Sequence, residues 1–364
     1  MPEAKSEAAP LKAGGDEPKG EAWYMRYGTA LALTFYVMIA VTKTLLTKSL
    51  LMGAPMPIAL SAMSCIVTCV MLIPFFLLNP SSFDIPRFLW TDRDKALGFA
   101  LVTVLVALDM GFTNIAVSML SVSIQQTILA VNPAFTVTIE SIVKRSLKHP
   151  VIYATIGILL FGPIITQIGQ PVTKSVVTGI IAQLAGCVCS ACKYVFGESV
   201  QKACKKDLGA FAFLFWLDAA TLIIFIPWCL INGEMVTLFS SIHDGVDFLK
   251  VFTNSFLGGM RFFSQLLVLR VSTATNLSCA NIAFQAINIY LSIPVLPSQA
   301  PEITAFLVCG TLLTLTTSGV YTYWKLSKVL EKAPMCIKLN TAFVETVTCS
   351  GKSSAEENAP YTKA

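Results

Sequence analysis

Runs of predominantly apolar residues recur along the chain from Tyr27 to Tyr323. Each is about 20 residues long, enough for a helix to cross the roughly 30 Å hydrocarbon core of a bilayer. Only 13% of the residues are charged, about half the share of roughly 25% that soluble proteins carry. This excludes a water-soluble globule and predicts an all-α, polytopic membrane protein in contact with lipid.

Polar breaks divide the runs into ten expected transmembrane helices. The third and fourth adjoin, so a very tight turn is expected near residues 114–118, and fusing the two would leave nine spans. We expect two five-helix halves, residues 27–169 and 176–323, between a polar segment 1–26 and a polar tail 324–364. The expected spans are residues 27–46, 58–78, 96–116, 117–142, 151–169, 176–195, 210–231, 251–269, 272–293 and 303–323.

The distribution of basic residues predicts the orientation. With ten spans, most of the 26 Lys and Arg residues fall on the side that holds both chain ends. Lys and Arg accumulate on the cytosolic side of membrane proteins, so both termini are expected in the cytosol. The net charge of +5 then reflects orientation, and no nucleic-acid partner is expected.

The first residues favour an endomembrane. Residues 1–26 carry five acidic side chains and no apolar core, unlike a secretory signal peptide or an Arg-rich, acid-poor transit peptide. We therefore expect the Golgi or endoplasmic reticulum membrane in preference to the plastid envelope.

Five ionisable residues fall inside the expected spans. They are Lys43, Asp109, Lys193, Asp218 and Arg261. Each costs about 2.5–3.5 kcal/mol at a helix centre on insertion scales, so such residues normally face a cavity or a partner. Snorkelling of the two lysines and structural ion pairs with the aspartates are the alternatives.

Uncharged polar groups accompany these charges. Spans 117–142 and 272–293 are the richest and occupy equivalent places in the two halves. Asn132 and Pro133 interrupt the first of these spans, because proline lacks the amide hydrogen that the helix needs. Such polar residues can also serve only to hold helices together. An odd number of spans per half makes the halves inverted repeats, an arrangement typical of secondary transporters with a site at the midplane.

Metal, cofactor and enzyme functions are not favoured. Most of the 11 cysteines lie in spans, where cysteine packs as a small apolar residue. Cys189 and Cys192 have metal-like spacing, but no second pair or nearby histidine accompanies them. Both histidines, His149 and His243, fall in expected loops. We expect no metal, no cofactor and no catalytic residue.

Several motifs resemble the drug/metabolite transporter superfamily, in particular its triose-phosphate translocator and nucleotide-sugar transporter branch. The similarity covers nearly the whole membrane region. It is carried by residues 42–46 (TKTLL), 113–116 (TNIA), 121–127 (SVSIQQT), 126–137 (QTILAVNPAFTV) and 269–275 (LRVSTAT). Two departures concern charge. Leu129 stands where the family has a lysine in helix four, and Ala283 and Phe284 replace the Lys-Arg pair of helix nine in the plastid translocators.

The resemblance implies an antiporter that exchanges a nucleotide sugar, or a related phosphorylated metabolite, for a nucleoside monophosphate or phosphate. Lys43 and Lys193 stand at or near basic positions of the family, whereas Arg261 stands where the family has an asparagine and supplies a cation from a new position. On this reading the phosphates are expected to bind Lys43, Lys193 and Arg261, and the sugar or base to bind Gln126, Thr275, Asn281 and Gln285. A homodimer is compatible with it. The lost basic residues leave two alternatives: transport of an uncharged or cationic solute, or a non-transporting receptor or scaffold.

Overall fold

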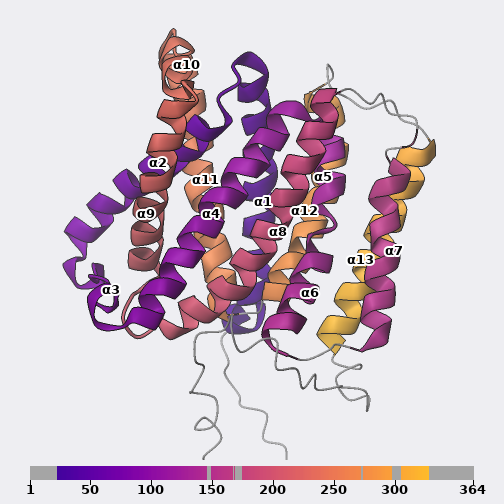
Figure 1. The fold of residues 1–364 in the computed structure, drawn as a ribbon, viewed down its shortest axis with the longest axis horizontal. Coiled ribbons are helices and arrows are strands. Elements are labelled where there is room, and N and C mark those ends of the chain that lie inside the picture. The colour runs from indigo at the N-terminus through magenta and orange to yellow at the C-terminus, as the bar shows by residue number, and fades with distance from the viewer. Residues whose placement is uncertain are drawn as a thin grey trace, which may run out of the picture.

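The computed structural model describes residues 23–145, 149–166, 168, 174–271, 274–296 and 305–327. Within these ranges the chain is a bundle of helices without a strand (Figure 1). The first half comprises α1 (Trp23–Gly53), α2 (Pro57–Leu78), the 3-10 turn η1 (Pro80–Ser82), α3 (Phe88–Thr91), α4 (Arg93–Met119), α5 (Val122–Leu129), α6 (Asn132–Val143) and α7 (Pro150–Thr166). The second comprises α8 (Lys174–Ala203), α9 (Ala210–Ile231), α10 (Glu234–Ser240), α11 (Gly245–Val271), α12 (Ala274–Val295) and α13 (Ala305–Ser327).

The expectation of an all-α membrane protein is confirmed. In the part of the chain that the structure describes, five stretches are long and apolar enough to cross a bilayer, namely Thr34–Gly53, Pro57–Leu78, Arg93–Met119, Val176–Ala203 and Ala210–Ile231. Large apolar side chains cover the outside of these helices: Leu77 is 75% exposed and Ile223 is 74% exposed. Polar side chains are buried instead, as expected where lipid is the solvent. Every predicted span overlaps a helix, while the ten crossings and the inverted repeat stay predictions.

The turn between the third and fourth spans lies later than expected. Helix α4 runs to Met119, so the turn falls at Leu120 and Ser121 and not within residues 114–118. The Ser121 hydroxyl accepts a hydrogen bond from the amide of Ile124 at 3.4 Å and so caps α5. This cap sets the start of α5, and the polar residues at 114–118 remain helical.

The fourth predicted span is broken in the middle. Helix α5 ends at Leu129 and α6 begins at Asn132, with Pro133 in its first turn. Proline is tolerated at that position because the first amides of a helix have no partner within it. The break therefore occurs where the Asn-Pro sequence predicts it.

Close helix contacts depend on small residues. Helix α11 packs against both α1 and α2, α4 packs along α8, and α7 packs along α13. At Gly259 of α11, an added Cβ atom would lie 2.0 Å from Oγ1 of Thr68 in α2. Small residues of this kind let helix backbones approach closely inside a membrane.

Candidate functional site

A polar cavity is lined by residues of α1, α4, α5, α6, α8, α11 and α12. The empty space, counted with its opening to solvent, is about 880 Å³. Six of the seven predicted binding residues line it: Lys43, Gln126, Lys193, Arg261, Asn281 and Gln285. Thr275 lies in α12, but its side chain is outside the described part of the structure. Their binding roles stay predictions.

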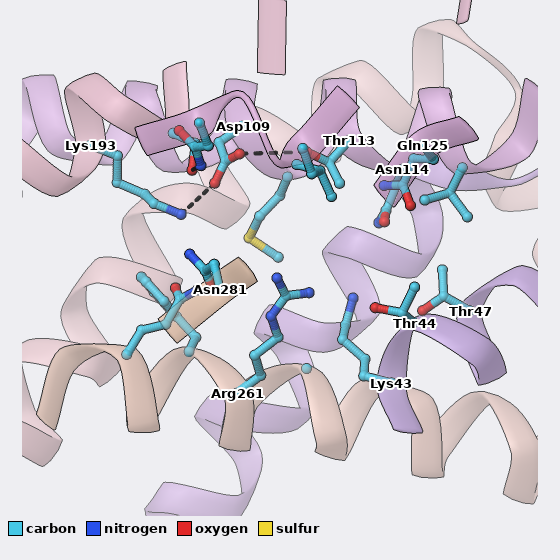
Figure 2. A pocket seen from close by; sticks show the side chains of 18 of the residues that line it. Lys43, Thr44, Thr47, Asp109, Thr113, Asn114, Gln125, Lys193, Arg261 and Asn281 are labelled. Carbon is cyan, nitrogen blue, oxygen red and sulfur yellow. Dashed lines mark hydrogen bonds and ion pairs between the residues drawn. The ribbon is translucent and has the colours of Figure 1, made fainter. Parts of the chain in front are cut away.

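Lys193 of α8 forms an ion pair with Asp109 of α4 on one wall of the cavity (Figure 2). The Lys193 ammonium also lies 4.9 Å from the centre of the Tyr194 ring, an arrangement that favours a cation. Only 8% of the lysine side chain and 12% of the aspartate side chain are exposed. Lys193 and Asp109 therefore form the structural ion pair that the sequence analysis gave as an alternative to substrate binding.

Lys43 of α1 and Arg261 of α11 point into the same space from the wall opposite Asp109 (Figure 2). Arg261 bonds to the hydroxyl of Tyr36. Lys43 is 8% exposed, and no hydrogen-bond or ion-pair partner for its ammonium group is present among the described residues. Of the described residues that line the cavity, three are cationic and one is a carboxylate. The cavity therefore has a formal excess of two positive charges.

A cluster of two tyrosines and two amides lies on the side of the cavity nearer the start of α1. Asn281 accepts a hydrogen bond from Tyr36 and donates one to the Tyr194 hydroxyl at 3.1 Å. Gln265 donates to the same two hydroxyls, at 3.1 and 3.5 Å. We call these four residues the tyrosine–amide cluster. It joins α1, α8, α11 and α12.

Sequence reasoning missed the tyrosines of this cluster. Tyr36 is completely buried and Tyr194 is 3% exposed. In the sequence they look like ordinary members of apolar runs, although a buried phenol hydroxyl normally needs a partner. The need of each buried hydroxyl for a hydrogen-bond partner was the sequence signal that could have indicated these tyrosines.

Toward the end of α1, further polar contacts lie beside the cavity or beyond it. Thr47 donates a hydrogen bond to Asn254 of α11 at 2.7 Å. Lys48 donates to the carbonyl oxygens of Val117 and Leu120, each at 2.7 Å, at the end of α4. A cation at a helix C-terminus stabilises the exposed carbonyls and the helix dipole. Sequence reasoning placed Lys48 in a loop beyond residue 46; this was wrong, because α1 continues to Gly53 and buries it.

Other polar residues lie away from this space. Asp218 hydrogen-bonds to the side chains of Thr68 and Cys65 between α9 and α2 and does not line the cavity. Leu129, at the position of the family lysine, does line it. The side chains of Ala283 and Phe284 are outside the described residues. Within the described ranges, no group of three His, Cys, Asp or Glu residues is arranged to hold a metal ion.

Comparison with known proteins identifies the family. The Triose-phosphate Transporter family, part of the drug/metabolite transporter superfamily, matches residues 27–324. No curated protein sequence matches the chain. A solved structure, described only as the crystal structure of a protein, superimposes with a TM-score of 0.58 at 15% identity, covering 83% of this chain and 99% of that one; at this identity the likeness concerns the fold alone. The resemblance in the sequence is thus confirmed, and the chain belongs to the triose-phosphate transporter family of multi-pass membrane transporters.

Proposed function

We propose that the cavity binds and transports a phosphorylated metabolite, most specifically a nucleotide sugar. The excess of cationic side chains in the cavity carries this proposal. Phosphate oxygens leave water only where charged or well-aimed donors replace their hydration, and Lys and Arg are the side chains that do so. The family's transport of phosphorylated sugars and nucleotide sugars supports the same substrate class.

Lys43 and Arg261 would bind the phosphates directly, because both point into the space that faces the Lys193–Asp109 pair. Lys193 would add its charge to a wall that its partner carboxylate partly neutralises. Gln126, Asn281, Gln285 and, by resemblance, Thr275 would hydrogen-bond the sugar or the base. Asn281 belongs to the tyrosine–amide cluster, so its engagement with substrate would exchange bonds within that cluster.

The antiport mechanism rests on the two halves acting as inverted repeats, and the helix packing supports this. Helix α1 opens the first half and packs on α11 and α12, while α8 opens the second and packs on α4 and α6. By order in each half, α11 corresponds to α4 and α12 to the α5–α6 pair. The contacts are therefore reciprocal, as a two-fold axis in the membrane plane requires. Such repeats can rock about a central site and expose it to one side at a time.

The cellular setting follows from the same proposal. Exchange of a nucleotide sugar for a nucleoside monophosphate would place the protein in the Golgi or endoplasmic reticulum membrane with both termini in the cytosol. The transporter would act without a cofactor or an enzymatic step. A homodimer is compatible with the apolar outer faces of the helices.

The test is counterflow into proteoliposomes that contain the full chain. Vesicles loaded with nucleoside monophosphates are offered nucleotide sugars, sugar phosphates and neutral sugars. We expect uptake of a phosphorylated solute, and we expect Lys43→Ala to abolish it without loss of protein from the membrane. Lys250→Ala is the matched control, because that lysine side chain is 52% exposed at the far end of α11. Uptake of a neutral or cationic solute alone, or full exchange by Lys43→Ala, would contradict the proposal.

A further inference from the structure

Among the described residues that line the cavity, only Asp109 carries a carboxylate. Its Oδ2 atom accepts from the Lys193 ammonium, and its Oδ1 atom accepts from the Thr113 hydroxyl at 3.5 Å. Across the cavity, Lys43 and Arg261 point into the same space (Figure 2). A carboxylate in this place needs an explanation, because it repels the phosphate that the cations attract.

The Asp109 carboxylate acts on all three cations of the cavity. It interacts electrostatically with Lys43 and with Arg261 as well as with its ion-pair partner Lys193. A phosphate group held among these cations therefore lies within range of the carboxylate too. Such interactions are strong in a site of this kind, where the effective dielectric constant is about 20 and not that of bulk water.

The formal charge of the cavity sets a limit on the charge of its ligand. Three cations and one carboxylate give an excess of two positive charges. Those side chains of α12 that lie outside the described part of the structure do not alter this value, since residues 272–296 include no Asp, Glu, Lys, Arg or His. A ligand with two negative charges is therefore fully compensated. A third negative charge loses its hydration on entering and gains no matching cation, which is costly.

We propose that Asp109 is a specificity-determining residue that limits the substrate to two negative charges, and so selects a diphosphate esterified at both ends over a free nucleoside diphosphate. This inference rests on the proposed transport of a phosphorylated metabolite. A diphosphate with both ends esterified, the chemistry of a nucleotide sugar, carries two negative charges. A free nucleoside diphosphate carries a third at neutral pH, because the last ionisation of a terminal phosphate has a pKa of about 6.

The selection works by repulsion of the competitor. Cations alone would bind the more highly charged compound more tightly, so a cavity with three cations and no carboxylate would favour the free diphosphate. A site can reject such a competitor by placing an unfavourable charge against it. Asp109 supplies that charge on the wall opposite Lys43 and Arg261. It thereby excludes the compound that remains when a nucleotide sugar has lost its sugar.

The test compares two ligands that differ by one charge and a methyl group. The full chain in detergent at pH 7.5 is titrated with a nucleoside diphosphate and with its β-methyl ester, and affinity is measured by ligand-induced thermal stabilisation. The base is whichever of adenine, cytosine, guanine and uracil gives the ester that stabilises the wild type most. We expect the wild type to bind the ester at least about tenfold more tightly than the free diphosphate. In Asp109→Asn this preference should vanish or reverse.

Three further variants separate the effect of charge from damage to the fold. The double variant Asp109→Asn with Lys193→Met again has an excess of two positive charges, so it should regain the preference for the ester. Lys193→Met alone has an excess of one and should widen the preference, which keeps the inference testable if Asp109→Asn does not fold. Asp218→Asn is the matched control. It removes a buried carboxylate that bonds to Thr68 and Cys65 outside the cavity, and it should leave the preference unchanged.

The outcomes distinguish this inference from the proposed function. Equal binding of the two ligands by the wild type, or a preference that survives Asp109→Asn, would overturn the inference and leave the proposed function standing. A double variant that behaves like Asp109→Asn would overturn it too, because the net charge of the cavity would then not decide the choice. If neither ligand binds the wild type while the protein stays folded, the proposed binding of a nucleotide sugar fails as well.

Discussion

Replacing Lys193 with methionine should destabilise the protein by about 3 kcal/mol, because it strands the carboxylate of Asp109. An exposed ion pair stabilises a protein by only about 0–1 kcal/mol, but here the side chains of Lys193 and Asp109 are only 8% and 12% exposed. Removing one partner of a buried pair costs about 3–5 kcal/mol. We take the lower limit because the pair borders a cavity. The double variant Lys193→Met with Asp109→Asn has no stranded charge and should recover most of the loss.

The free energies of unfolding of the wild type, both single variants and the double variant are measured by titrating the detergent-solubilised protein with a denaturing detergent. The coupling energy between the two sites is the readout, and contacting residues typically show 0.5–3 kcal/mol. Affinity for methyl phosphate gives a second, independent readout. It should weaken in Lys193→Met and strengthen in Asp109→Asn, because the substitutions change the charge of the cavity in opposite directions. Additive losses of stability, with the double variant the least stable of the four, would refute the ion-pair reasoning.

Three further predictions concern the scaffold, and each is measured as the free energy of unfolding in detergent. Gly259→Ala places a methyl group 2.0 Å from Oγ1 of Thr68 and should lower this free energy by about 1–3 kcal/mol through overpacking. The control Gly157→Ala has nothing within 4 Å of the new methyl group and should not lower it. Equal effects of the two substitutions would contradict the close approach of the helices at Gly259. Glu234→Gln should lower the free energy of unfolding by about 1 kcal/mol, because the Glu234 carboxylate accepts hydrogen bonds from the first amides of α2 at 2.7 and 2.9 Å. An unchanged midpoint of the unfolding titration would show that this cap does not stabilise the protein. Lys48→Met should cost about 2 kcal/mol by leaving two carbonyls unpaired, and a neutral result would show that water replaces the ammonium.

The helices were predictable from the sequence because apolar length dominates folding in lipid. Their ends were not, and α1 illustrates the reason. The apolar run weakens after residue 46, yet the helix continues to Gly53, because the buried Lys48 finds carbonyl partners at the end of α4. That contact joins residues about 70 positions apart, and no local pattern encodes it. The displaced turn at Leu120 has a local cause instead, because the Ser121 hydroxyl caps α5.

The charged part of the cavity was predictable for a similar reason, since ionisable residues in lipid must converge on a polar interior. Lys43, Lys193 and Arg261 do meet there. Their partners were not predictable. Nothing in the sequence distinguishes Asp109, which pairs with Lys193, from Asp218, which bonds to Thr68 and Cys65. Cys187, expected only to pack, also accepts a hydrogen bond from Gln183 and donates one to the backbone carbonyl of Ile128.

The tyrosine–amide cluster has a consequence for the speed of transport. A motion that separates α1, α8, α11 and α12 near the start of α1 breaks the hydrogen bonds among Tyr36, Tyr194, Gln265 and Asn281 together. In an apolar medium each such bond is worth about 4–6 kcal/mol until water arrives to replace it. The cost falls on the opening step as activation enthalpy, so warming should accelerate turnover far more than it changes substrate affinity.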